Sequence, residues 1–208
     1  MDARPSLWHQ VTHHLNVLVW ALPAPRRVKA LLSRLVYQNP PMPMASTVRA
    51  LIALEAASIV AVLMGGWGVD ALIGEQLRVH HDLDLIVDHS QLDPALMALG
   101  ALGFKEWFRN PDPAPFGERQ LEGSIVVRDG AMHVVDLHPL HLGEEGPALT
   151  EGAIGGHPVT CLAPEVQIEV NARSQISTRS NRDKRRYQAN LEVARRALGG
   201  DSLTSGHS

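Results

Sequence analysis

Two aspartates, Asp82 and Asp84, stand two residues apart at the start of a short apolar run. Residues two apart on a strand project from the same face of a sheet, so we expect both carboxylates to point in one direction. Charges about 4 Å apart repel by roughly 4 kcal/mol at an effective dielectric of about 20, which favours a cation or a proton between them. Mg2+ binds carboxylate and phosphate oxygens together, so the pair predicts a magnesium site. Solvated charge at the end of a strand is the alternative explanation.

Glycines upstream of the pair predict a site for phosphate groups. Gly65 and Gly66 follow the apolar run 58–64, which has the character of a buried strand. Glycines let backbone amides approach a polyphosphate, and a short helix expected over 69–73 directs its positive N-terminal end toward the same charge. A strand, a glycine turn, a helix and a returning strand with carboxylates would together form one nucleotide site.

Three residues between the glycines and the aspartates have alternative roles. Arg78 is expected either to contact a triphosphate or to pair with Asp70 or Glu75. Trp67 is a candidate for stacking on the nucleotide, but packing against the glycine turn is the favoured role. His80 is expected either to order the first aspartate of the pair through a hydrogen bond or to contact the substrate.

A third carboxylate, Asp136, lies in the apolar run 132–137. An Asp-Gly step separates this run from another at 124–127, and such a step predicts a hairpin of two antiparallel strands. Nothing in the local pattern separates a catalytic aspartate from an ordinary one at a hairpin end. His138 and His141 have the spacing of a metal pair, but we do not expect them to be ligands.

The remaining pattern predicts an α/β fold in which a small mixed sheet is flanked by helices. Strands are expected over 83–87 and 158–162. The segment 109–120 is rich in proline and charge and predicts a mobile loop over the site. Helices are expected over 46–57, from a capping box at Ser90 and Asp93 to Gly103, from Pro164 onward, and along the stripe Tyr187, Leu191, Ala194 and Leu198.

Prolines at 40, 41 and 43 cannot continue a helix and predict a linker. The expected division of the chain is a helical extension with this linker (1–43), a catalytic domain (44–163), a C-terminal helical region (164–200) and a disordered tail (201–208).

The composition is that of an ordinary soluble globular protein. Of the 208 residues, 45% are hydrophobic and 20% charged, and the net charge of -3 provides no overall basic field. Cys161 is the single cysteine, which excludes an intramolecular disulfide and favours a reducing, cytoplasmic location. No segment reaches the ~20 apolar residues that span a bilayer, so no membrane partner is expected.

The segment from Gly65 to Asp84 resembles the signature of polymerase-beta-type nucleotidyltransferases, in which a Gly-Gly or Gly-Ser turn precedes Asp-x-Asp. The most similar variety is the aminoglycoside 2″-adenylyltransferase-like group, with the related lincosamide nucleotidyltransferases. In that group Gly-Gly-Trp-(Gly/Ala)-x-Asp leads through Arg-x-His to Asp-x-Asp at the spacing seen here. The resemblance covers about residues 46 to 165 and includes Val135-Asp136-Leu137-His138-Pro139 and Cys161-Leu162-Ala163-Pro164-Glu165.

This resemblance implies the nucleotidyltransferase fold and transfer of a nucleoside monophosphate from ATP or another NTP, with release of pyrophosphate. It implies that Asp82 and Asp84 bind Mg2+ and that Gly65 and Gly66 hold the nucleotide phosphates. Asp136 takes the third carboxylate position, either as ligand of a second metal or as the base that removes the acceptor proton. The implied acceptor is a small hydroxylated molecule such as an aminoglycoside or lincosamide antibiotic.

The C-terminal part departs from the family pattern. Where relatives have an acidic run, this chain has a cationic run that consists of Arg179, Arg182, Lys184, Arg185 and Arg186. Lys184 is a candidate for nucleotide binding. The same run is alternatively a site for an RNA backbone. A toxin-like nucleotidyltransferase that modifies tRNA or protein and is paired with an antitoxin is therefore the second functional hypothesis, and an inactive nucleotide-binding module is the third. A homodimer is left open.

Overall fold

A computed structural model describes residues 40–116, 119–143, 146–177, 184–185 and 188–195. Residues 1–39 of the expected helical extension and the tail expected at 201–208 lie outside these residues, as do Tyr187 and Leu198 of the last predicted helix. None of the helices in the described part is long and apolar enough to cross a membrane.

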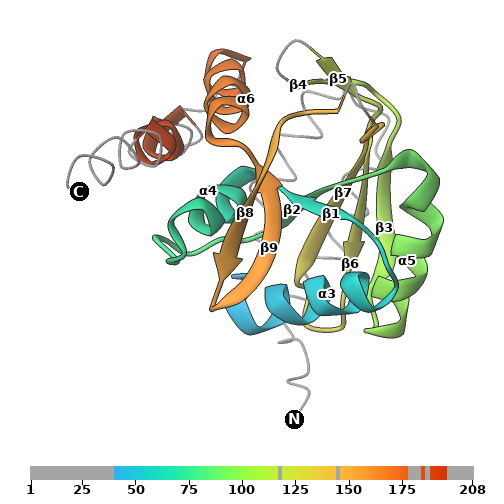
Figure 1. The fold of residues 1–208 in the computed structure, drawn as a ribbon. Coiled ribbons are helices and arrows are strands. Elements are labelled where there is room, and N and C mark those ends of the chain that lie inside the picture. Colours follow the sequence, from blue (N-terminus) through green and yellow to red (C-terminus); the bar gives the residue numbers. More distant parts are fainter. Residues whose placement is uncertain (1–39, 117–118, 144–145, 178–183, 186–187, 196–208) are drawn as a thin grey trace.

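A mixed sheet of seven strands organises the described residues (Figure 1). Its strands, in spatial order, are β3 (Lys105–Asn110), β6 (Ser124–Arg128), β7 (Val134–Pro139), β2 (Leu83–Val87), β1 (Ala61–Leu63), β9 (His157–Leu162) and β8 (Leu149–Ile154). β2 is parallel to β7 and β1 is parallel to β9, whereas the other neighbours are antiparallel. The predicted small mixed sheet flanked by helices is confirmed, and so is the predicted hairpin, which consists of β6 and β7.

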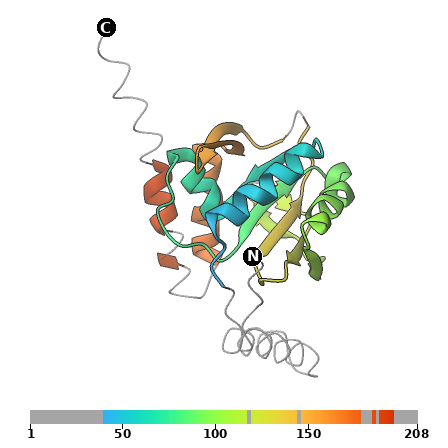
Figure 2. The same cartoon turned by 90° about the horizontal axis from the view of Figure 1, so that it is seen from below.

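Side chains alternate along β2 between two separate cores. Leu83, Leu85 and Val87 are buried in the larger core, together with side chains of two helices, α3 (Met44–Ala56) and α5 (Leu92–Ala101). Ile86 belongs to a second core on the opposite face. Figure 2 shows α3 and α5 side by side along the molecule. Since neighbouring residues of a strand face opposite sides, Asp84 lies on the face of Ile86, away from α3 and α5.

The segment 109–120 is not the loop that its composition predicted. It contains the end of β3 and a two-stranded hairpin, β4 (Ala114–Phe116) with β5 (Arg119–Leu121). Phe116 and Leu121 are both buried in the second core. Proline and charged residues dominate this segment, and the two apolar side chains do not form a strand-like alternation. The hairpin therefore could not be predicted from the local sequence and is evident only from the packing of Phe116 and Leu121.

Two helices stand beside the sheet at the end that carries the glycines. α4 (Gly65–Ile73) begins directly after β1, four residues earlier than the predicted helix, because Met64 is extended and the glycines themselves form the first turn. α6 (Pro164–Ser177) begins at the predicted proline. Residues 188–195 are helical as well, and Leu191 and Ala194 of the predicted stripe are buried.

Two further local predictions need correction. The expected capping box at Ser90 is replaced by Asp88, whose carboxylate accepts hydrogen bonds from the Ser90 amide and hydroxyl and leads into the 3-10 turn η1 (His89–Gln91). The edge strand β8 was missed, because Ile154 is its only fully buried residue and the strand therefore lacks a clear apolar alternation.

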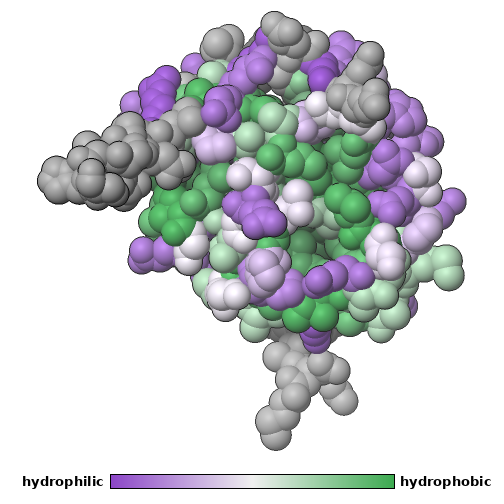
Figure 3. Space-filling model, in the orientation of Figure 1, coloured by the Kyte–Doolittle hydropathy of each residue, from purple (hydrophilic) through white to green (hydrophobic). Residues whose placement is uncertain are grey.

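Apolar side chains also remain on the surface near the end of α4. Ile73, Leu77 and Val79 are 40%, 45% and 59% exposed. Figure 3 shows hydrophobic residues gathered over the region of α4, while polar residues are more frequent over the strands β4 and β5. The surface around α4 is thus more apolar than the surface around the β4 and β5 hairpin.

Candidate active site

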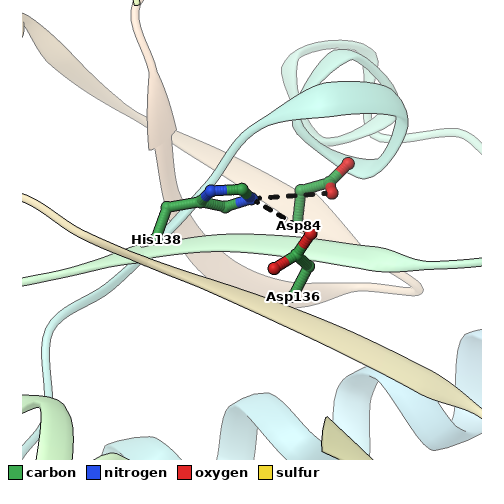
Figure 4. Close-up of side chains that lie close together, drawn as sticks. All are labelled: Asp84, Asp136 and His138. Atoms are coloured by element: carbon green, nitrogen blue, oxygen red, sulfur yellow. Dashed lines mark ion pairs between the residues drawn. The ribbon is translucent and has the colours of Figure 1, made fainter. Parts of the chain in front are cut away.

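Asp84 and Asp136 lie directly beside each other on the parallel strands β2 and β7. His138 follows Asp136 by two residues on β7, so the alternation of the strand brings its ring to the same face. The three side chains converge in Figure 4, and one ligand atom of each lies within 4.8 Å of the others. His138 Nε2 is 3.6 Å from Asp136 Oδ2 and 3.9 Å from Asp84 Oδ1.

Charge and burial act together in this cluster. Burial is the main cause of a raised pKa of Asp136, and the Asp84 carboxylate adds to it, while His138 opposes it. For His138, burial lowers the pKa, but the Asp84 and Asp136 carboxylates outweigh burial and the net shift is upward. At separations of 3.6 and 3.9 Å these pairs are charge interactions rather than formed hydrogen bonds. The site therefore favours a positive charge between its two carboxylates.

The donor set fits a divalent metal ion. Within the described part of the chain, the buried polar atoms without a hydrogen-bond partner include Asp136 Oδ1 and both ring nitrogens of His138. Buried polar groups normally have such partners, so unsatisfied atoms aimed at a common point are characteristic of a ligand site. Carboxylate oxygens are the donors that Mg2+ takes, whereas an imidazole nitrogen is a softer donor. Asp84 and Asp136 would hold a divalent metal ion, with His138 beside it.

Asp82, the other aspartate of the pair, lies immediately before β2 and is partly buried. The cluster formed by Asp84, Asp136 and His138 does not include it. Its assignment as a metal ligand therefore remains a prediction.

The glycine turn presses directly on the carboxylate of Asp84. Gly65, the first residue of α4, has a φ of +63°, and a Cβ added to it would overlap Asp84 Oδ2. The backbone amide of Met64 donates to the carbonyl of Asp84 over 3.1 Å, which fixes the turn to β2. The amides in the first turn of a helix have no intrahelical acceptors, and here that turn lies at the carboxylate of Asp84, a candidate metal ligand.

His80 supports this turn from inside the protein. Its Nε2 is 2.5 Å from Asp70 Oδ2, and both side chains are 2% exposed. The His80 ring packs on the ring of Trp67 with centroids 4.6 Å apart, and Trp67 is 1% exposed. The partner of His80 is thus Asp70, not the aspartate pair. Trp67 occupies the core, which agrees with the packing role and leaves no open ring face for a base.

Arg78 also lies against the glycine turn. A Cβ at Gly66 would overlap both Arg78 Nη2 and the His80 ring, so the guanidinium is in contact with the turn. Arg78 Nη2 donates to Asn190 Oδ1 over 3.3 Å. The role of Arg78 in nucleotide binding remains a prediction. Lys184 is exposed, and its role is likewise a prediction.

Two residues of the candidate site were not assigned to it from the sequence. His138 was considered with His141 and not expected to be a ligand, although it follows Asp136 by two residues on a predicted strand and lies in the cluster. Its apparent partner by spacing, His141, packs instead near His89, with ring centroids 5.8 Å apart. Gln167 of α6 donates to the carbonyl of Gly65 over 2.9 Å, although 102 positions separate the two residues. No local pattern signals that contact.

Comparison with solved structures defines the class of fold. A crystal structure of ANT(2″)-Ia in complex with adenylyl-2″-tobramycin matches with a TM-score of 0.58 and 18% identity, over 78% of this chain and 92% of that one. A lincomycin-bound lincosamide antibiotic adenylyltransferase, LnuA, matches with a TM-score of 0.54 and 18% identity, over 75% and 98%. The chain therefore has the fold of these nucleotidyltransferases.

Sequence comparison defines the family. The family model for aminoglycoside-2″-adenylyltransferase matches residues 47–186, and the chain belongs to this family. A lincosamide resistance protein of Staphylococcus haemolyticus is 27% identical over 100 residues. That match covers 47% of this chain and 54% of the relative, so it spans about half of either protein.

Proposed function

We propose that this protein is a Mg2+-dependent nucleotidyltransferase that moves a nucleoside monophosphate from an NTP to a hydroxyl group of a small molecule, with release of pyrophosphate. The observation that carries the proposal is the pairing of Asp84 with Asp136 directly beside Gly65, the first residue of α4. Carboxylates for a metal and helix amides for phosphate thereby meet at one point, as phosphoryl-group transfer requires. Membership of the aminoglycoside-2″-adenylyltransferase family supports the same activity.

The residues divide the work between binding and proton transfer. Asp84, with Asp82 as a further candidate, would hold Mg2+, which when bound neutralises phosphate charge. Gly65 and Gly66 would let the backbone approach the triphosphate, with Arg78 alongside as a cation. Asp136 is then placed either to complete the metal site or to take the proton of the attacking hydroxyl, and a raised pKa suits a base working near neutral pH.

An antibiotic is the acceptor that the relatives favour. One solved neighbour carries adenylyl-2″-tobramycin, another carries lincomycin, and the curated relative is named for lincosamide resistance. We therefore propose an aminoglycoside or a lincosamide as acceptor and ATP as donor. Both antibiotic classes present several hydroxyl groups to which a nucleotide can be attached.

The deciding experiment is label transfer from each of the four α-labelled NTPs, with and without Mg2+, to aminoglycosides, to lincosamides and to tRNA. We expect Mg2+-dependent labelling of one antibiotic class, with ATP preferred and with no labelling by Asp84→Asn. Labelling of tRNA alone would overturn the small-molecule acceptor and support the toxin-like alternative. Labelling of nothing, together with no binding of Mg2+-NTP, would support the inactive binding module.

A further inference from the structure

A series of hydrogen bonds, joined at Gln167 through its backbone, leads from the glycine turn through α6 to residues 188–195 and back to Arg78. Gln167 Nε2 donates to the carbonyl of Gly65 over 2.9 Å. Asn171 Nδ2 donates to the main-chain carbonyl of Gln167 over 2.7 Å, and Asn190 Nδ2 donates to Asn171 Oδ1 over 3.1 Å. Arg78 Nη2 then donates to Asn190 Oδ1 over 3.3 Å. The series begins at Gly65 and ends at the guanidinium that touches Gly66.

The three amide side chains of this series are buried. Gln167, Asn171 and Asn190 are 0%, 2% and 4% exposed. Burying an amide is unfavourable, and Gln167 Oε1 has no hydrogen-bond partner among the described residues. Apolar side chains of similar size would fill the same space without this cost. Three buried amides in one series therefore point to a task that apolar packing cannot perform, namely holding particular polar groups in fixed directions.

The chemistry of the two ends fixes the direction of every bond. A main-chain carbonyl can only accept, so Asn171 must use its amide nitrogen toward Gln167 and its oxygen toward Asn190. Asn190 must then donate to Asn171, which leaves its own oxygen for Arg78, and a guanidinium can only donate. Each amide thus has one orientation, and a change at Asn190 affects both Asn171 and Arg78.

The series holds the two groups that would meet a triphosphate. In a trans peptide the C=O and the following N–H point in opposite directions, so the bond from Gln167 to the Gly65 carbonyl also orients the Gly66 amide away from α6. Asn190 meanwhile holds the Arg78 guanidinium beside that same residue. The main-chain amide and the cation are positioned from behind by a single set of side chains.

We propose that Gln167, Asn171 and Asn190 are positioning residues for the triphosphate of the NTP, and that residues 188–195 are therefore part of the nucleotide site. This inference rests on the proposed function. None of the three amides touches the reacting atoms; they act through the Gly65 carbonyl and through Arg78. A loss in this series should weaken NTP binding more than it slows the chemical step.

A double-mutant cycle tests the coupling. We expect Asn190→Ala to raise the KM for NTP about tenfold while kcat changes less than about threefold, since a hydrogen bond to a charged group is lost but the carboxylates stay in place. Arg78→Ala should raise KM at least as much, and the effect of the double variant should be smaller than the sum of the two single effects, because both changes remove the contact between Asn190 and Arg78. Additive effects, or an unchanged KM in Asn190→Ala, would overturn the proposal.

A control and a second readout separate positioning from folding. Gln188, exposed on the same helix and bonded to Glu192 over 3.5 Å, provides the matched variant Gln188→Ala, for which no change in KM is expected. In the nucleotide-free protein, amide hydrogen exchange of the peptide 64–68 should accelerate in Asn190→Ala and in Gln167→Leu but not in Gln188→Ala. Unchanged exchange in both variants would overturn the series as a support of the turn. If Asn190→Ala does not fold, Asn190→Ser replaces it in both measurements.

The outcomes also separate this inference from the proposed function. Native protein that binds no Mg2+-NTP would overturn the proposed function, and the positioning of a triphosphate with it. Native protein that transfers nucleotide, combined with a KM in Asn190→Ala equal to that of the native protein, would overturn the positioning role alone.

Discussion

Gly65 and Asp84 are in contact through the side of Gly65 on which any other residue carries its Cβ: a Cβ built there overlaps Asp84 Oδ2. The contact joins the glycine turn to β2, the strand that carries Asp84, without an intervening side chain. It also means that the first residue of α4 cannot be enlarged without moving a carboxylate of the candidate metal site.

Gly65→Ala should therefore damage both stability and activity. The left-handed backbone, with φ of +63°, costs about 1–2 kcal/mol for a residue with a Cβ, and the overlap with Asp84 adds to that cost. Gly74→Ala is the matched control, because Gly74 has a φ of +77° but nothing within 4 Å of an added Cβ. We expect urea unfolding to show a lower free energy of unfolding in both variants. Nucleotidyl transfer should fall only in Gly65→Ala. Equal activity in the two variants would contradict the contact.

Asp84→Asn should abolish transfer and leave the fold intact, since it removes a metal charge without changing the volume of the side chain. The Asp84 charge repels Asp136, and its removal relieves that repulsion. The same charge attracts protonated His138, and its removal loses that attraction. The two effects oppose each other, so the change in unfolding free energy should be small. Asp82→Asn is expected to abolish transfer as well if Asp82 is a ligand. Asp93→Asn, an exposed aspartate of α5, is the control. Native turnover in Asp84→Asn would refute the metal assignment.

Asp136→Asn should lower kcat by about two orders of magnitude or more, a size typical of a base or a metal ligand. The pKa of Asp136 is raised in the folded state, mainly by burial, so its contribution to stability is present at acid pH and is lost as pH rises through the folded pKa. The variant should consequently be more stable than the native apo protein at neutral pH and lose this advantage at acid pH. A decrease in kcat of less than about threefold would show that Asp136 is neither base nor metal ligand and is an ordinary aspartate of the hairpin.

Asp88→Asn tests how the end of β2 is held to the segment that follows β7. The Asp88 carboxylate, at the end of β2, accepts from the amide of Leu142 over 3.0 Å and from Ser90, and these bonds lower its pKa from 3.8 to about 2. A lowered pKa stabilises the folded state above the unfolded pKa, and this contribution is lost as pH falls toward about 2. Native protein should thus be more stable than Asp88→Asn at pH 7, and the two should converge as the pH falls below the unfolded pKa. Thermal unfolding as a function of pH measures the difference, and a gap that does not narrow would refute the role of the charge.

Much of the local structure followed from the sequence alone. The strand 83–87 was predicted with its observed ends, because a short apolar run between an aspartate pair and a polar segment permits few other structures. The hairpin of β6 and β7 followed from its Asp-Gly step, and α6 from Pro164. In each case the signal and the structure involve residues that are close together in the chain, where backbone preferences and alternation are decisive.

Only the tertiary structure decided which of these elements meet. The parallel register of β2 with β7 places Asp84 beside Asp136 and brings His138 to the same face. A register between strands that are distant in the chain depends on the packing of both faces of the sheet, and the sequence of one strand alone does not determine it. The same holds for the bond from Gln167 to Gly65 and for the amide series to Asn190, where each local segment reads as an ordinary polar helix. The aspartates and glycines could be identified from the sequence, because paired carboxylates suggest metal binding and glycines suggest a turn that approaches phosphate. The amides that support them could not, because asparagine and glutamine acquire a role only from the partners that the fold brings to them.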